Sequence, residues 1–104
     1  MSAPTTTTFP SGLRGITATD CDGREWSAIL LPAPQNTVSV GVKPTLAERR
    51  RPDWSTRTEP LPYEGDALWA QFAANAYDGT EADGLTVAAR LINIALTHIA
   101  NQKD

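Results

Sequence analysis

The sequence contains one cysteine, Cys21, and one histidine, His98, among its 104 residues. A single cysteine excludes an internal disulfide and fits a reducing compartment. One histidine and one cysteine are too few ligands for a structural zinc site within the chain. Nucleophilic catalysis needs a base within hydrogen-bond reach of the nucleophile. Nothing in the sequence brings Cys21, at a predicted turn, to His98, near the chain's end, so we expect no catalytic residue and no metal site.

The sequence also lacks long apolar runs, a leader peptide and a phosphate-binding glycine loop. No apolar stretch approaches the length of about 18 residues that indicates a membrane-spanning helix. The N-terminus, "MSAPTTTTFPSG", has no basic region followed by an apolar one, as a secretory signal would. Neither of the standard glycine spacings for nucleotide phosphates occurs. We therefore expect no cofactor, and we expect a cytoplasmic location in a bacterial cell or a phage-infected host.

Positive charge is scarce, because the formal net charge is −3 at pH 7. This balance argues against bulk attraction to nucleic acid or to anionic membranes. The cations present are mostly arginine, with seven arginines to two lysines. Such a bias is typical of genes with high G+C content and favours a bacterial or phage source.

The remaining composition predicts a mobile N-terminal arm and one folded domain. Residues 1–12 hold four consecutive threonines, two prolines and little to pack except Phe9. They are predicted to be a disordered arm, with Phe9 as a tether. Residues 13–104 are predicted to be a single α+β domain. Its expected architecture is a three-stranded antiparallel meander, followed by an antiparallel helix pair packed on one face of the sheet.

The meander is expected over residues 13–42, beginning with a hairpin. Asp22 and Gly23 separate two strand-like runs, which predicts a tight turn. A two-residue loop would place Asp20 opposite Glu25, a like-charge pair that a longer loop would relieve. In the two-residue register, the faces carry Ile16, Ala18 and Ile29 on one side and Thr17, Trp26, Ala28 and Leu30 on the other. The third strand, "TVSVGV", alternates so that Val38, Val40 and Val42 point inward.

The second half of the domain is predicted to be a loop and two helices. Four prolines break residues 43–63, which we interpret as a connecting loop. Residues 64–103 are predicted to form a helical hairpin, with Asp66 capping the first helix and Gly79 ending it. The second helix is apolar around most of its circumference. It leaves a narrow polar strip of Thr86, Arg90, Asn93, Thr97 and Asn101, predicted to be an ordinary solvent-exposed face.

The loop contains the strongest candidate for a binding site, "ERRRPDWSTR" at residues 48–57. Three interpretations are open. In the first, the segment is a solvent-exposed loop that its tryptophan holds in place. In the second, it is a surface that binds carboxylates of a partner protein. In the third, it is a phosphate-binding site with the tryptophan stacking on a base. The net charge and the absence of a second basic cluster weigh against nucleic acid. The predicted partner-binding residues are Arg49, Arg50, Arg51, Trp54 and Arg57.

The apolar excess of the last helix suggests a second surface. Either this helix is the central rod of the domain, or it packs against another protein or a second copy of the chain. The residues predicted for self-association, which would give a homodimer, are Leu91, Ile94, Leu96 and Ile99.

These observations predict a small non-enzymatic protein that acts through protein contacts, as an accessory, regulatory or virion-type factor. A nucleic-acid-binding regulator that uses Arg49, Arg50 and Arg51 is the alternative. Part of an enzyme completed by a partner chain is the third possibility.

Overall fold

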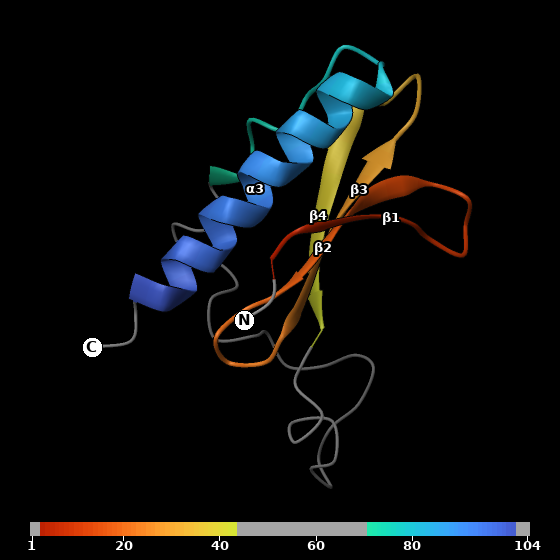
Figure 1. The fold of residues 1–104 in the computed structure, drawn as a ribbon. Helices are drawn as coiled ribbons and strands as arrows, with labels where there is room; N and C mark the ends of the chain where they lie inside the picture. The colour runs from red at the N-terminus through yellow and green to blue at the C-terminus, as the bar shows by residue number, and fades with distance from the viewer. Residues whose placement is uncertain (1–2, 44–70, 102–104) are drawn as a thin grey trace, which may run out of the picture.

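In a computed structural model, residues 3–43 and 71–101 form a four-stranded antiparallel sheet with one long helix across one face (Figure 1). The strands lie in chain order, β1-β2-β3-β4, so the sheet is a meander. Their bounds are Thr5–Thr8 for β1, Arg14–Thr19 for β2, Glu25–Leu31 for β3 and Thr37–Lys43 for β4. The helix, α3, spans Glu81–Asn101. Within these described residues, no helix combines the length and apolar character needed to cross a lipid bilayer.

The expected three strands are wrong because the predicted disordered arm supplies a fourth. The threonine run forms β1, which pairs antiparallel with β2 from Thr5↔Thr17 to Thr8↔Arg14. Threonine is β-branched and favours extended backbone. A four-residue edge strand is stabilised by its hydrogen bonds to a neighbour, so it needs little apolar burial of its own. Pro4 and Pro10 flank this strand, which is one edge of the sheet.

The expected helix pair is also wrong. The first helix was predicted over residues 64–79, but residues 74–79 are not helical. They run beside β4, where Ala76 bridges Thr37. The backbone N–H of Val38 donates to the Asn75 carbonyl at 2.9 Å, and the Asn75 side-chain amide donates to the Val38 carbonyl at 3.0 Å. The apolar spacing of this segment suits a helix, yet asparagine disfavours helix interiors, and the β4 edge provides the alternative backbone partners.

The β2–β3 hairpin has a three-residue loop, one residue longer than the Asp-Gly signal suggests. Asp20 N–H donates to the Arg24 carbonyl, and Gly23 N–H donates to the Asp20 carbonyl, both at 3.0 Å. Gly23 has a φ of 85°, the left-handed conformation that three-residue loops require. Glu25 therefore lies opposite Thr19 and not Asp20, and it forms an ion pair with Lys43 at 3.5 Å. The unfavourable like-charge pair is avoided.

This single-residue shift reverses the predicted faces of β3. Trp26 is paired with Ala18, and Ala28 with Ile16, so the buried residues of both strands share one face. Because side chains alternate along a strand, a slip of one residue moves a whole strand's pattern to the other face. For β4 the predicted alternation is confirmed, since Val38 is buried and Val40 and Val42 pack partly buried against the same core.

The core lies between this face and α3. Trp26 is fully buried and meets Phe72 edge to face, with ring centroids 6.4 Å apart. The helix contributes a continuous apolar stripe: Val87, Ala88, Leu91, Ile92, Ala95, Leu96 and Ile99. Most of the apolar residues around α3 are therefore buried in the core of the chain itself.

The start of α3 is fixed by reciprocal hydrogen bonds. The Thr80 hydroxyl accepts from the Asp83 backbone N–H at 3.3 Å, and the Asp83 carboxylate accepts from the Asp78 N–H at 2.9 Å. Asp78 in turn accepts from the N–H and hydroxyl of Thr80 at 2.8 Å and 2.6 Å. These bonds satisfy donors that a helix N-terminus leaves unpaired.

These contacts predict a pH dependence at the helix start. The Thr80 hydroxyl, and then its backbone N–H, lower the pKa of Asp78 below the ordinary value of 3.8. A pKa lowered by folding means that the carboxylate stabilises the fold above pH 3.8, and that this stabilisation is lost as the pH falls through the folded-state pKa. An NMR titration of the Asp78 carboxyl carbon should give a midpoint below 3.8. The Asp78→Asn variant should lose that part of the acid sensitivity of unfolding, and a midpoint at or above 3.8 would contradict the assignment.

Candidate binding groove along the C-terminal helix

The arginine-rich candidate site lies outside the described residues. Arg49, Arg50, Arg51, Trp54 and Arg57 all fall in that part of the chain, so their role in partner binding stays a prediction.

The four residues predicted for self-association lie on α3. Leu91 and Ile99 are 0% exposed and Leu96 is 8% exposed, all within the chain's own core. Ile94 is partly buried at the rim of that core. Ile94 is therefore the member of this set whose side chain is most available to another molecule.

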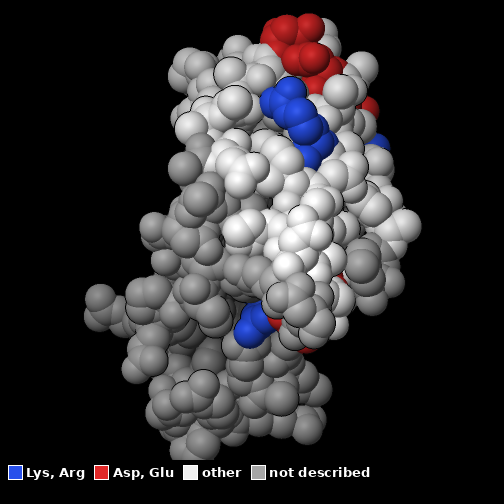
Figure 2. Space-filling model, turned by 90° about the vertical axis from the view of Figure 1, so that its left-hand side faces the viewer, with Lys and Arg blue, Asp and Glu red and all other residues white. Residues whose placement is uncertain are grey.

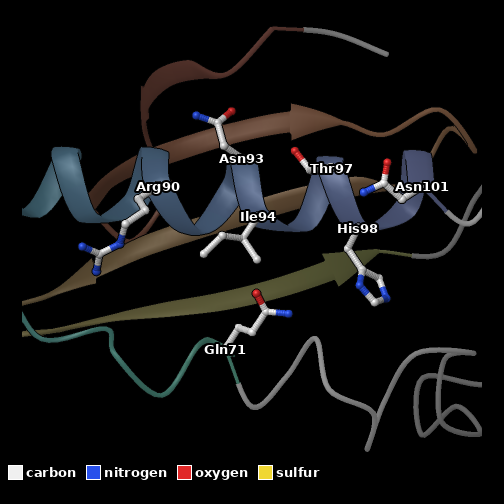
Figure 3. A pocket seen from close by; sticks show the side chains of 7 residues that line it. All are labelled: Gln71, Arg90, Asn93, Ile94, Thr97, His98 and Asn101. Carbon is white, nitrogen blue, oxygen red and sulfur yellow. The ribbon is translucent and has the colours of Figure 1, made fainter.

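A groove of about 590 Å³ runs along the side of α3 (Figure 3). Its lining residues are Gln71, Arg90, Asn93, Ile94, Thr97, His98 and Asn101. Four of them belong to the polar strip that was predicted to be an ordinary solvent face. Sequence periodicity found the polar strip but not the groove, because the opposite wall carries Gln71, which comes from the segment that was predicted to be the first helix of the pair.

The α3 residues of the groove form two rows. Arg90, Ile94 and His98 follow each other at intervals of four residues and point toward the segment that carries Gln71 (Figure 3). Asn93, Thr97 and Asn101 have the same interval and point away from that segment (Figure 3). Residues four apart on a helix lie one above the other. The groove therefore has a length of about 16 Å from Arg90 to Asn101, at 1.5 Å per residue.

Arg90 is held in place at one end of the groove. Its Nη2 donates a hydrogen bond to the Ala74 carbonyl oxygen at 2.9 Å, which links α3 to the segment beside β4. A guanidinium carries five N–H donors, and this bond uses one of them. Since Arg90 is exposed, its remaining donors are oriented by the anchor and accessible from solvent.

The described lining residues offer hydrogen bonds and the positive charge of Arg90, and none of them is an acid. Gln71, Asn93 and Asn101 have amides that both donate and accept, and the Thr97 hydroxyl does the same. None of the seven lining residues is Asp or Glu. Among the described lining residues, Thr97 carries the hydroxyl and His98 carries the imidazole. These two side chains belong to different rows and point to different sides of the helix (Figure 3). The arrangement offers hydrogen-bond donors and acceptors to a polar ligand.

Charge is distributed unevenly on the helix side of the molecule. In Figure 2 acidic side chains gather at the end where α3 begins, basic side-chain atoms lie directly below them, and a broad uncharged surface follows. The first turn of α3 contains the acids Glu81 and Asp83. Glu81 pairs with Arg14 at 3.2 Å, so part of this charge is neutralised locally.

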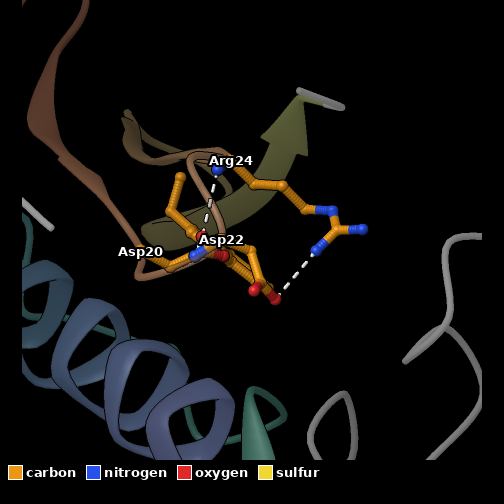
Figure 4. Close-up of polar contacts among 4 residues, drawn as sticks. Asp20, Asp22 and Arg24 are labelled. Carbon is orange, nitrogen blue, oxygen red and sulfur yellow. Dashed lines mark hydrogen bonds and ion pairs between the residues drawn. The ribbon is translucent and has the colours of Figure 1, made fainter. Parts of the chain in front are cut away.

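The carboxylates of the β2–β3 turn have structural partners (Figure 4). Asp20 is 1% exposed, and its Oδ1 accepts from the backbone N–H groups of Asp22 and Arg24 at 2.8 Å and 3.0 Å. Its Oδ2 accepts from the Trp26 indole N–H at 2.8 Å. Asp22 pairs with Arg24 at 3.1 Å. Cys21, predicted to be an inert turn residue, is exposed at the same turn. This cluster closes the hairpin over the core.

Residues 3–43 and 71–101 contain one histidine, one cysteine and several carboxylates. Among them, no three His, Cys, Asp or Glu side chains come together in an arrangement that would hold a metal ion.

Comparisons with family models, curated proteins and solved structures find no match. The functional argument therefore starts from the chemistry of the groove.

Proposed function

We propose that this chain is a non-enzymatic protein-binding factor, of an accessory or regulatory kind, that contacts a partner protein through the groove on α3. The observation that carries the proposal is the lining: among the described residues, three amides, a hydroxyl, an imidazole and an anchored guanidinium line the groove together with one apolar side chain, Ile94. Protein contacts combine apolar contact with a polar rim of satisfied hydrogen bonds. The groove offers both over a length of about 16 Å.

A protein partner fits these features better than nucleic acid. Phosphate recognition normally uses several cations spread along one face, and Arg90 is the one lysine or arginine among the described lining residues. The net charge of −3 opposes a polyanion further. The arginine-rich segment at residues 48–57 would add a second contact region for the same partner, and this remains a sequence-based prediction.

The proposal predicts that filling the groove abolishes partner binding. Thr97 lies in the middle of its row and is exposed, so Thr97→Arg would add a long charged side chain to the lining of the groove. We expect affinity purification from the producing cells, read by mass spectrometry, to show at least about a tenfold loss of the retained partner, which corresponds to 1.4 kcal/mol or more.

Thr86→Arg is the matched control for this experiment. Thr86 is an exposed threonine of the same helix and lies outside the groove lining. Both variants add the same charge and remove the same β-branched residue. Retention of the partner by Thr86→Arg and its loss from Thr97→Arg would support the proposal. Equal retention by both variants would refute it.

A further inference from the structure

The geometry points to a specific kind of occupant: an extended, acidic segment of a partner polypeptide. This inference rests on the proposed function, because it names the partner chemistry of the same groove. It is argued from the hydrogen-bonding groups of the lining, from the spacing of the two rows and from the charge of Arg90.

The polar lining favours an extended peptide over a helix. A docking helix would present an apolar face, and that face would bury the amides of Asn93 and Asn101 without partners. Each buried amide left without a hydrogen bond costs about 1–3 kcal/mol. An extended segment has free backbone N–H and C=O groups, which side-chain amides and the Thr97 hydroxyl can both donate to and accept from. The backbone of an extended segment therefore supplies hydrogen-bond partners to the polar side chains of the groove, and these side chains supply partners to the backbone.

The spacing of the rows also matches an extended chain. Asn93, Thr97 and Asn101 are four residues apart, a rise of about 6 Å at each step along a helix. Two residues of an extended chain advance about 6.6 Å. Each member of the row can thus meet every second peptide unit of the occupant. A groove of about 16 Å accommodates about five extended residues on this basis.

The charge of the lining selects an acidic side chain on the occupant. Arg90 is anchored at Ala74, and a fixed guanidinium binds carboxylates through two parallel hydrogen bonds. None of the described lining residues is an acid that would compete for it. The overall charge of −3 opposes this preference, but charges more than about 8 Å away are largely screened at physiological ionic strength. The charge of Arg90, which contacts the occupant directly, therefore determines the preference for an acidic side chain.

A phage-displayed library of random heptapeptides tests the inference with the full-length chain as bait. We expect the selected peptides to be enriched in Asp or Glu at one position, and to bind wild type and Thr86→Arg but not Thr97→Arg. In fluorescence anisotropy, Arg90→Gln should weaken the selected peptides at least about tenfold, a loss of 1.4 kcal/mol. Arg14→Gln, which removes an exposed arginine paired with Glu81 outside the groove, should leave their affinity unchanged.

Three results would overturn the inference. The first is that no peptide is selected, or that basic or apolar peptides dominate. The second is acidic peptides that bind Thr97→Arg as well as wild type. The third is a labelled single strand of oligo-dT that binds wild type and is lost with Thr97→Arg, which would assign the groove to phosphates. If the partner protein is still lost from Thr97→Arg while the peptide selection fails, protein binding stands and only the acidic, extended occupant is wrong.

Discussion

Replacing Trp26 by alanine is expected to remove about 4 kcal/mol or more of stability, which is a large part of the total for a domain of this size. Trp26 is 0% exposed and packs edge to face on Phe72. Truncation removes the largest side chain that is fully buried among the described residues, and it leaves a cavity. Urea unfolding followed by far-UV circular dichroism measures the loss without relying on tryptophan fluorescence. A loss under about 1 kcal/mol would show that Trp26 is not central to the core.

The variant Trp26→Phe separates packing from the hydrogen bond to Asp20. Phenylalanine keeps an aromatic ring at the site but cannot donate to the Asp20 Oδ2, which now accepts the indole N–H at 2.8 Å. A buried acceptor that loses a partner costs about 1–3 kcal/mol. We expect Trp26→Phe to lie between wild type and Trp26→Ala. If Trp26→Phe matches wild type, the buried hydrogen bond contributes nothing measurable.

The substitution Gly15→Ala is expected to destabilise the sheet by about 3 kcal/mol, at the upper end for overpacking. A methyl group at Gly15 would overlap the carbonyl oxygen of Ala28 on the neighbouring strand, and it would lie 2.7 Å from Cε2 of Phe9. The overlap with Ala28 involves backbone, which cannot rotate away as a side-chain end can. Relief would require β2 and β3 to separate or Phe9 to leave its place.

Gly41→Ala is the matched control for the Gly15 experiment. Gly41 is also a strand glycine, but it is exposed on β4 and a methyl group there meets nothing within 4 Å. Alanine in a strand loses less backbone entropy on folding than glycine, a gain of about 0.5–1 kcal/mol. Thermal unfolding should therefore give opposite shifts for the same chemical change at the two positions. A similar small effect at both would contradict the close approach of Phe9 and Ala28 to Gly15.

The sequence was a good guide where local pattern and tertiary contact agree. The alternation Val38, Val40 and Val42 predicted β4, and the apolar period after Gly79 predicted α3. At the β2–β3 hairpin the strands were placed correctly, but the register depends on a loop length that Asp22-Gly23 does not determine. The like charges of Asp20 and Glu25 were the one signal in the residues that favoured the longer loop.

Elements that depend on distant partners were missed. β1 exists because β2 offers it an edge, which the threonine run cannot reveal by itself. Residues 74–79 have a helical apolar pattern, yet their backbone pairs with β4. The sequence pattern identified part of the groove lining, because it marked Arg90, Asn93, Thr97 and Asn101 as a polar strip. Gln71 and the anchor between Arg90 and Ala74 come from across the fold, and only three-dimensional structure brings them to the strip.

The two prolines beside β1 have a consequence for concentrated solutions of this protein. An open sheet edge can recruit a strand from a neighbouring molecule and begin fibril growth. Phe9 N–H bonds to Leu13 within the hairpin, so by alternation Thr6 and Thr8 direct their backbone groups away from the sheet. Pro4 and Pro10 continue that outward row, and neither has an N–H to offer an incoming strand. Pairing along the β1 edge is thereby limited to the short stretch between the two prolines, in a segment whose composition alone suggests no structure.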